Sequence, residues 1–226
     1  MKAIIFDFDG TITYKSKNIW SWVWAKLGLS DVYHKLYEEY KAGKYNYQEW
    51  CDITCDIFRD KRLQYNDIKT AASETKLIKG FGETVKELKE KGIGLYIVSG
   101  SIIEGIELVL GENVKYFDKI IANHFVFDKK GVISRINATK YDYEGKSVFA
   151  SELIKKLDIS PKELCFIGNG DNDEWVYKTG CRTICINPDG ADFSNTVKWS
   201  RCIQQSDDFR DLLPIIESLE EENERE

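Results

Sequence analysis

Short runs of apolar residues recur along the chain, and each is followed by glycine or acidic residues. The runs are continuous rather than alternating, which is the pattern of strands covered on both faces of a sheet. Helical patterns separate the runs, so successive strands would be joined by helices and lie parallel to one another. The predicted strands are residues 3–6, 94–98, 164–167 and 183–186.

The segments between these strands carry helix signals, and two of them stop at a glycine, Gly92 and Gly111. Glycine just past the last apolar position is typical of a helix C-terminus. Strands and helices together predict an α/β fold whose core is a Rossmann-like, doubly wound parallel sheet. The predicted core helices are residues 84–91, 102–110, 147–157 and 209–219.

Residues 13–79 have a different pattern, because their apolar residues are spaced at helical intervals. We therefore expect a helical cap domain at residues 14–79, inserted into a core domain formed by residues 1–13 and 80–219. Because the insertion follows the first strand directly, the cap would lie over the carboxyl ends of the strands, where open α/β sheets bind ligands. Residues 220–226 are nearly all charged and predict a frayed tail.

Two shorter signals add detail to this plan. Asn46 followed by Glu49 resembles a capping box, and it would open a cap helix that carries the apolar stripe from Trp50 to Phe58. Farther along, residues 125–127 and 132–134 flank a turn that ends in glycine. This second pattern predicts a small β-hairpin that extends the sheet near its edge.

Composition and charge narrow the range of partners. The net charge is −6 with both signs interspersed and no long basic block, so neither nucleic acid nor an anionic membrane is an expected partner. No apolar run approaches the roughly 20 residues that cross a bilayer, and the start of the chain lacks the pattern of a secretory signal. We expect a cytoplasmic protein, a monomer or a homodimer, that acts on a small soluble molecule. The six cysteines have no metal-binding spacing and predict mostly reduced, buried thiols.

Candidate chemistry begins at the end of the first strand. Asp7 and Asp9 are two residues apart, so strand alternation would point both carboxylates to the same side. Such a pair can divide the work of a nucleophile and a proton donor. Taken alone, the same residues also fit an acidic turn in which an aspartate caps a helix.

Complementary groups follow three other predicted elements of the core. Ser99 and Gly100 end the second strand ahead of a helix, where a hydroxyl and backbone N–H groups could bind an anion. Lys146 opens a later helix and could neutralise phosphate and carboxylate charge. Residues 168–173, Gly-Asn-Gly-Asp-Asn-Asp, are oxygen-rich and suit a hard cation such as Mg²⁺. Together with the first motif, these groups favour catalysis over a structural turn.

In this order, residues 7–11, Ser99, Lys146 and residues 168–173 resemble the four motifs of the haloacid-dehalogenase-like superfamily. The helical insertion after the first motif is similar to the C1-capped, phosphoserine-phosphatase-like branch. The resemblance implies that Asp7 is the nucleophile of an aspartyl-phosphate mechanism and that Asp9 is the general acid and base. It implies phosphate binding by Thr11, Ser99, Gly100 and Lys146, and Mg²⁺ ligation by Asp7, the Asp9 carbonyl, Asn169 and Asp173.

The chain departs from that branch at positions that concern the metal and the substrate. Asn169 stands where the pattern has an aspartate, so which of Asn169, Asp171 and Asp173 binds the metal is left open. The two charges that would hold an amino acid are absent near Ser16 and near residues 52–54, which disfavours phosphoserine. A methionine-salvage phosphate is one alternative that the resemblance suggests. Aromatic cap residues take the place of those charges, and the candidates for substrate contact are Trp20, Trp24 and Trp50.

The function predicted from the sequence is therefore Mg²⁺-dependent hydrolysis of a small phosphate monoester. Two alternatives stay open at this stage. A phosphotransferase would use the same intermediate and pass the phosphoryl group to an alcohol. A receiver-like module would be phosphorylated without turning over a substrate, although receivers lack a helical insertion after the first acidic strand.

Overall fold

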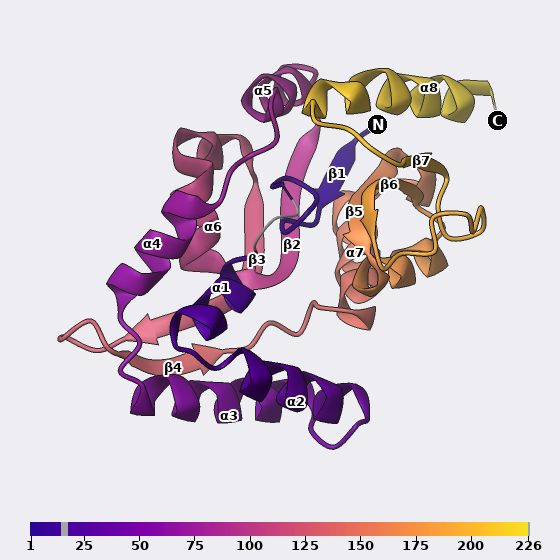
Figure 1. Ribbon diagram of the computed structural model, residues 1–226. Helices are drawn as coiled ribbons and strands as arrows, with labels where there is room; N and C mark the ends of the chain where they lie inside the picture. Colours follow the sequence, from indigo (N-terminus) through magenta and orange to yellow (C-terminus); the bar gives the residue numbers. More distant parts are fainter. Residues whose placement is uncertain (15–17, 226) are drawn as a thin grey trace.

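The computed structural model describes residues 1–14 and 18–225, and these form a mixed, mostly parallel sheet with helices packed around it (Figure 1). The strand order is β4-β3-β2-β1-β5-β6-β7. All neighbours are parallel except β3 and β4, which pair antiparallel. This arrangement confirms the predicted fold class. The strands are β1 (Ala3–Phe6), β2 (Gly94–Ile102), β3 (Lys119–Phe127), β4 (Ile133–Asn137), β5 (Leu164–Gly170), β6 (Arg182–Asp189) and β7 (Arg201–Ile203).

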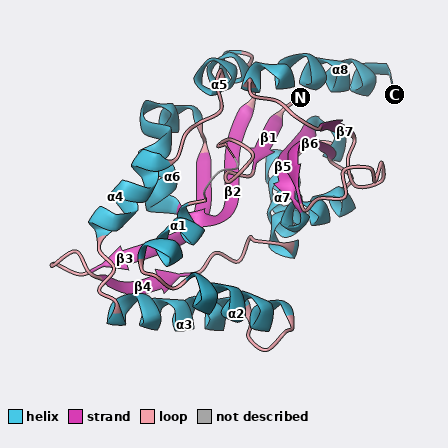
Figure 2. Cartoon of the chain, in the orientation of Figure 1, coloured by secondary structure: helices cyan, strands magenta, loops and turns pink. Residues whose placement is uncertain are grey.

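The central strand β1 sends successive side chains to opposite faces of the sheet, as strand geometry requires. Ile4 and Phe6 pack on one face with Phe81 and Phe209, whereas Ile5 packs on the other face with the helix that contains Lys146. Every residue of β1 is buried, which explains its continuous apolar run. The core helices that cover these faces are α5 (Phe81–Glu90), α6 (Ile103–Leu110), α7 (Glu144–Leu157) and α8 (Leu212–Arg225) (Figure 2).

Four further helices separate β1 from α5, where the sequence predicts a helical insertion. α3 matches the predicted apolar stripe from Trp50 to Phe58, and the capping box of Asn46 and Glu49 is present at its start. The four helices are α1 (Ile19–Lys26), α2 (Ser30–Lys41), α3 (Tyr47–Asp60) and α4 (Tyr65–Glu74).

The predicted hairpin is confirmed, but it does more than extend the sheet edge. β3 begins in the main sheet beside β2 and continues into the antiparallel pair with β4. There Phe125 contacts Trp20 and Phe58, with ring centroids 5.4 and 6.1 Å apart. The hairpin therefore packs against both α1 and α3 (Figure 1).

The carboxyl-terminal helix differs from the sequence prediction. α8 continues to Arg225, so most of the segment expected to fray is helical. Asn223 explains part of this difference, because its Oδ1 accepts hydrogen bonds from Arg182 and its Nδ2 donates to the Lys162 carbonyl. Short 3₁₀ segments complete the chain at Gly111–Tyr116, Pro161–Glu163, Asp171–Thr179 and Phe209–Asp211.

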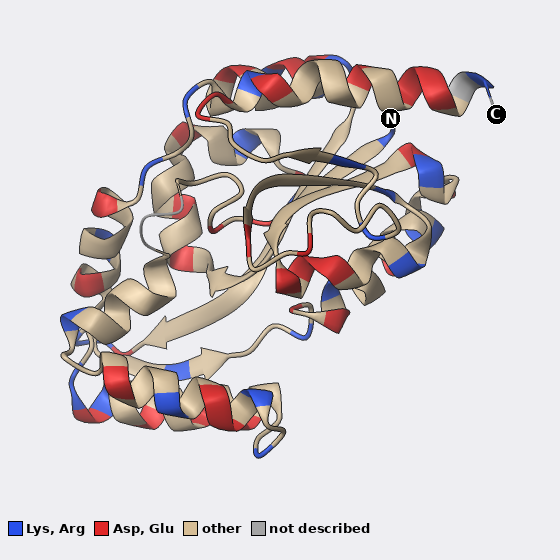
Figure 3. Cartoon of the chain, turned by 45° about the vertical axis from the view of Figure 1, so that its right-hand side comes forward, with Lys and Arg blue, Asp and Glu red and all other residues tan. Residues whose placement is uncertain are grey.

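Many charged residues lie on the outer faces of the helices and in loops (Figure 3), whereas Asp7, Lys146 and Asp173 are buried. Lysines, arginines, aspartates and glutamates alternate on those faces, which is the usual pattern of amphipathic helices around a buried sheet. Within the described ranges, no helix has both the length and the apolar character needed to traverse a bilayer. The cysteines are free thiols, and all except Cys202 are buried.

Candidate active site

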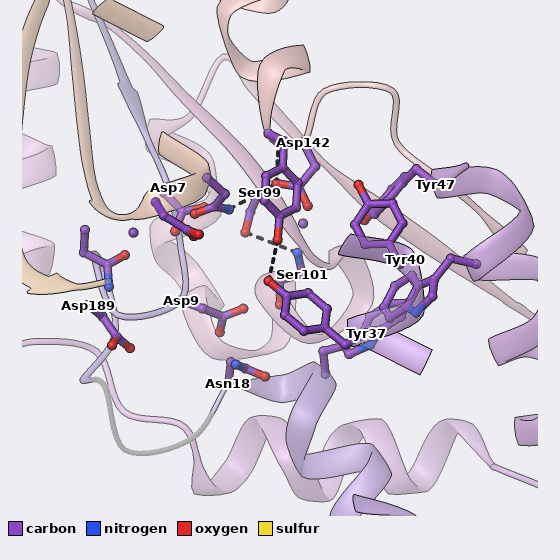
Figure 4. Close-up of a pocket in the computed structure, with 18 of the residues that line it drawn as sticks. Asp7, Asp9, Asn18, Tyr37, Tyr40, Tyr47, Ser99, Ser101, Asp142 and Asp189 are labelled. Atoms are coloured by element: carbon purple, nitrogen blue, oxygen red, sulfur yellow. Dashed lines mark hydrogen bonds between the residues drawn. The ribbon is translucent and has the colours of Figure 1, made fainter. Parts of the chain in front are cut away.

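A cavity of about 300 Å³ opens at the carboxyl ends of the central strands, on the side that faces α1, α2 and α3 (Figure 4). The carboxyl ends of neighbouring parallel strands meet at one edge of a sheet, so the polar residues at the ends of β1, β2 and β5 come together here. Side chains from the strand ends form one wall and aromatic side chains from α1 to α3 form the other. The core residues that line the cavity include Asp7, Asp9, Ser99, Gly100, Ser101, Asp142, Asn169, Asp171 and Asp189.

Asp7, Lys146 and Asp173 form a buried ion-pair network beneath the cavity. Lys146 Nζ lies 2.8 Å from Asp7 Oδ1 and 2.6 Å from Asp173 Oδ1. Burial lowers the pKa of Lys146, but Asp173 and Asp7 outweigh burial and hold that pKa above its ordinary value. Burial raises the pKa of Asp7 to about 7, Lys146 opposes this effect, and Asp173 adds to it. Lys146 is therefore a permanent cation that favours the charged form of Asp7.

Asp9 faces the cavity beside Asp7 but lacks a comparable cation. Its Oδ1 is buried and has no hydrogen-bond partner within the described part of the chain. Burial raises the pKa of Asp9 to about 6, while the nearby Ser101 hydroxyl and Ile19 backbone lower it in part. A carboxyl group with this pKa can hold or release a proton near neutral pH, as a general acid and base must.

The carboxyl-terminal part of β2 provides a small polar cradle. Ser99 is buried, and its hydroxyl accepts a hydrogen bond from the backbone N–H of Ser101 at 3.2 Å. Asn123 Nδ2 donates to the Gly100 carbonyl at 2.6 Å and fixes the backbone of this segment. A Cβ at Gly100 would collide with the carboxylate of Asp142, so only glycine fits between this segment and that side chain.

Asp173 organises the turn after β5 rather than lying open to the cavity. Its Oδ2 accepts hydrogen bonds from the backbone N–H groups of Asn169 and Gly170, at 2.8 and 2.9 Å. Its Oδ1 contacts Lys146. Thr11 is fully buried and donates to Asn169 Oδ1 at 3.0 Å. Thr11 and Asp173 thus position Asn169, which itself lines the cavity.

The oxygen atoms around Asp7 suit a hard cation in kind. Mg²⁺ prefers carboxylate, carbonyl and amide oxygens, with water completing its shell. The Asp7 carboxylate and the Asn169 side chain both border the cavity. Asp9, whose backbone carbonyl is a further oxygen, lines it as well. Among the described residues, no group of three or more histidine, cysteine, aspartate or glutamate side chains could hold a metal ion. A cation here would therefore depend on amide and backbone oxygens as well as on carboxylates.

The wall opposite the catalytic turns is aromatic. Trp20 and Trp50 stack with ring centroids 5.1 Å apart, and both line the cavity. Trp24 lies elsewhere, because it is fully buried against Phe58 and Tyr33 and does not border the cavity. The tyrosines that line the cavity are Tyr33, Tyr37, Tyr40, Tyr47 and Tyr143.

Several lining residues were not singled out from the sequence. Asp142 and Tyr143 lie on the loop before α7, shortly before Lys146, which is the only sequence signal for them. Tyr33, Tyr37 and Tyr40 recur at helical spacing on α2, and this pattern indicates a single face of a helix. Asp189 ends β6 beside the oxygen-rich segment of residues 168–173. The loop and the tyrosine face were identifiable in principle, but only with the knowledge that α1, α2 and α3 contribute to the cavity lining.

The sequence lacks amino-acid-binding charges near Ser16 and near Asp52 and Thr54. Ser16 lies outside the described residues. Asp52 is exposed and accepts a hydrogen bond from Gln48, and Thr54 is fully buried. Neither Asp52 nor Thr54 lines the cavity.

A family model described as haloacid dehalogenase-like hydrolase matches residues 1–175. A phosphoserine phosphatase from Archaeoglobus fulgidus is 25% identical over 189 residues, which are 82% of this chain and 52% of that protein. The chain therefore spans about half the length of that relative. A phosphoserine phosphatase from Methanocaldococcus jannaschii is 24% identical over 225 residues, 95% of this chain and 97% of that protein.

A solved structure of a substrate-bound phosphoserine phosphatase complex has the same fold. It superposes with a TM-score of 0.74 at 21% identity, covering 95% of this chain and 97% of the other. At that level of identity the likeness concerns the fold alone.

Proposed function

The chain belongs to the haloacid dehalogenase-like hydrolase family, and from this premise we propose that it is a Mg²⁺-dependent phosphatase that hydrolyses a small phosphate monoester through an aspartyl phosphate on Asp7. The observation that carries the proposal is the buried contact of Lys146 with both Asp7 and Asp173. A buried lysine that joins two carboxylates beneath a cavity supplies a fixed positive charge where a phosphoryl group would meet its nucleophile.

The neighbours of Asp7 and Asp9 support different roles in two-step hydrolysis, because Asp7 contacts Lys146 whereas Asp9 has no comparable cation beside it. Asp7 is held next to Lys146, and we propose that its ionised Oδ attacks phosphorus. As the bond from Asp7 to phosphorus forms and the ester bond breaks, Asp9 donates its proton to the leaving oxygen. Asp9 then takes a proton from the water that attacks the aspartyl phosphate, so phosphate leaves and Asp7 is regenerated. The raised pKa of Asp9, about 6, supports this double role.

Other groups would hold the phosphoryl oxygens. Ser99 and Gly100 line the cavity with Asp7, and the Lys146 ammonium lies beneath it in contact with Asp7. The Ser99 hydroxyl, the Gly100 backbone N–H and the Lys146 ammonium can each donate to an anionic oxygen. Mg²⁺ bound by the Asp7 carboxylate, the Asp9 carbonyl and Asn169 would neutralise charge on phosphate and carboxylate. Thr11 and Asp173 would act through Asn169 and Lys146, because their polar atoms are already engaged with those residues.

The test is the loss of turnover in Asp7→Asn. With p-nitrophenyl phosphate and Mg²⁺, we expect kcat to fall by at least about a thousandfold, because an amide cannot form the covalent intermediate. Asp60→Asn, an exposed position at the end of α3, is the matched control and should retain activity. Circular dichroism would verify that both variants fold. An Asp7→Asn protein with wild-type turnover would refute the assignment of the nucleophile.

A phosphotransferase would pass the same test, so a second measurement separates the two reactions. Inorganic phosphate released and alcohol phosphorylated are quantified with increasing glycerol or ethanolamine. A hydrolase releases one phosphate for each ester consumed at all acceptor concentrations. A transferase diverts phosphate to the acceptor.

A further inference from the structure

The cap side of the cavity presents a compact set of aromatic rings. Tyr40, Tyr47 and Trp50 lie with their ring centroids 6.0 Å apart in each pairing. Tyr143, from the core loop before α7, meets Tyr40 edge to face at 6.1 Å. All of these residues line the cavity, and Figure 4 shows Tyr40 and Tyr47 across from Asp7 and Asp9. The faces of tyrosine and tryptophan rings attract cations, most strongly where water is excluded.

The position of Tyr47 connects this aromatic set to the reaction centre. Its hydroxyl accepts a hydrogen bond from Asn123 Nδ2 at 2.8 Å, and the same amide group donates to the Gly100 carbonyl. Gly100 follows Ser99 in the proposed phosphate cradle. The aromatic set therefore begins where the leaving group of a bound ester would emerge.

Asp142 adds a carboxylate to the same space. Its Oδ1 accepts hydrogen bonds from Asn172 Nδ2 and from the Tyr143 backbone N–H, at 3.1 and 2.9 Å. Both hydrogen bonds that this carboxylate accepts within the described part of the chain go to Oδ1, which leaves Oδ2 for a ligand. Oδ2 lies close against Gly100. After burial, Asp142 is the largest cause that raises the pKa of Tyr40, to about 12, and of Tyr47, so its negative charge acts on both phenol groups.

The remaining charges of the cavity have the same sign. Asp171 and Asp189 also line it, and no lysine or arginine does so among the described residues. The nearest lysine on α2, Lys41, lies outside the cavity, 3.4 Å from Asp171 and 5.0 Å from the Tyr143 ring centroid. A leaving group with a carboxylate would meet like charge without a partner, whereas a cationic one would meet opposite charge and ring faces.

We infer that the preferred substrate is the phosphate ester of an alcohol that carries an ammonium or quaternary ammonium group, with the cation held between Asp142 and the rings of Tyr40, Tyr47 and Trp50. This inference rests on the proposed phosphatase function and adds the chemical class of its leaving group. It also separates this chain from an enzyme for phosphoserine, whose carboxylate would find no lysine or arginine among the described residues that line the cavity.

Two esters of matched shape test the role of the charge. Phosphocholine and 3,3-dimethylbutyl phosphate differ only in a quaternary nitrogen that is replaced by carbon, so size and shape stay nearly constant. Because the charged nitrogen also changes the leaving group, the ratio of each variant is compared with that of wild type. We expect kcat/KM to be at least tenfold higher for phosphocholine, and higher than for phosphoserine. A ratio near one, or a preference for phosphoserine, overturns the inference.

A third ester, p-nitrophenyl phosphate, shows which proposal has failed if the result is negative. Turnover of this ester without turnover of either matched ester overturns the cationic specificity and leaves the phosphatase proposal intact. If no ester is hydrolysed, the phosphatase proposal fails and this inference fails with it.

Variants assign the preference to particular groups. Asp142→Asn should bring the ratio between the matched esters toward one, whereas Asp60→Asn removes an exposed cap charge and should leave it unchanged. Tyr40→Phe keeps the ring face and should largely keep the ratio, and Tyr40→Leu should lower it severalfold. Because the ratio is measured within each variant, partial loss of folded protein cancels. An unchanged ratio in both Asp142→Asn and Tyr40→Leu overturns the assignment.

Discussion

Asn169 controls the charge at the proposed cation site. It is 5% exposed, its Oδ1 accepts from Thr11, and its backbone N–H donates to Asp173. Asn169→Asp keeps the size of the side chain and adds a carboxylate near Asp7. Without Mg²⁺ we expect a lower Tm than wild type, because another buried anion is unpaired. Mg²⁺ should then bind about tenfold more tightly, because ligand charge sets affinity at such sites.

The measurement is Tm as a function of Mg²⁺ concentration, with EDTA as the metal-free reference. Asn66→Asp, at an exposed position in α4, adds the same charge away from the cavity and should respond to Mg²⁺ as wild type does. If the Tm of Asn169→Asp rises no more steeply with Mg²⁺ than that of wild type, residue 169 does not belong to the cation site.

The raised pKa of Asp9 predicts a pH-dependent cost of folding in the metal-free protein. Because the folded pKa, about 6, lies above the ordinary value of 3.8, the folded state binds the proton more tightly than the unfolded state. The stability that this provides is complete below about pH 4 and is lost as the pH rises through about 6. Asp9→Asn is neutral throughout, so its Tm in EDTA should rise relative to wild type between pH 4 and 7. A constant difference across that range contradicts the assigned shift.

At the level of single residues, the sequence predicted the candidate catalytic residues at the strand ends, but it did not predict the residues that line the opposite wall of the cavity. Asp7, Ser99 and Lys146 follow predicted strands or open predicted helices, so their convergence follows from parallel topology. Asp142 lies in a loop without a regular pattern, and the role of Tyr40 depends on how the cap packs on the core. Those positions are set by tertiary contacts that periodicity does not encode.

Among the elements, α3 offers the clearest link between a local signal and stability. The Asn46 side chain accepts from the Glu49 N–H at 3.0 Å, and the Glu49 side chain accepts from the Asn46 N–H at 2.8 Å. Asn46→Ala removes half of this capping box and should lower the free energy of unfolding by about 1 kcal/mol. Urea denaturation followed by circular dichroism measures this change.

Asn46→Asp is the matched control for that experiment, because aspartate caps a helix equally well and suits the positive end of the helix dipole. It should unfold at or above the wild-type midpoint. Equal midpoints for the alanine and aspartate variants would mean that the cap contributes nothing to the stability of α3.

The elements that the sequence missed lack a clean pattern for physical reasons. β7 has three residues, begins with Arg201 and is only half-buried, so it shows no continuous apolar run. β3 mixes partly exposed apolar residues with Lys119 and His124, because it lies near the edge of the sheet. Central strands such as β1 are covered on both faces, so they can be recognised in the sequence as continuous apolar runs.

For the whole molecule, the sequence predicted a helical cap over an α/β core, but it did not predict the side-chain contacts between the cap helices and the core. The Tyr37 and Tyr143 hydroxyls lie 2.6 Å apart and connect α2 to the loop before α7. Phe125 of the hairpin fills the space beneath α1 and α3. Both contacts join segments distant in sequence, and neither residue type predicts its partner.

The end of α8 gives the sharpest difference between the sequence pattern and the folded molecule. A charge-rich tail is usually solvated, yet Asn223 bonds to Arg182 at 2.7 and 3.0 Å and to the Lys162 carbonyl at 2.7 Å, and Glu222 pairs with Arg201. Deleting residues 220–226 should therefore lower the free energy of unfolding by about 1–3 kcal/mol and Tm by roughly 2–10 °C.

Deleting only residues 224–226 keeps Glu222 and Asn223, removes the exposed Arg225 and its surface ion pair with Glu221, and should leave Tm nearly unchanged. Differential scanning calorimetry of the two truncations separates the explanations, since a solvated tail predicts no effect from either. A large effect from the longer deletion alone assigns the stability to the few contacts that fasten the last turn of α8 to β6 and β7. Equal Tm values for both truncations and for wild type would mean that the last turn contributes no stability in solution.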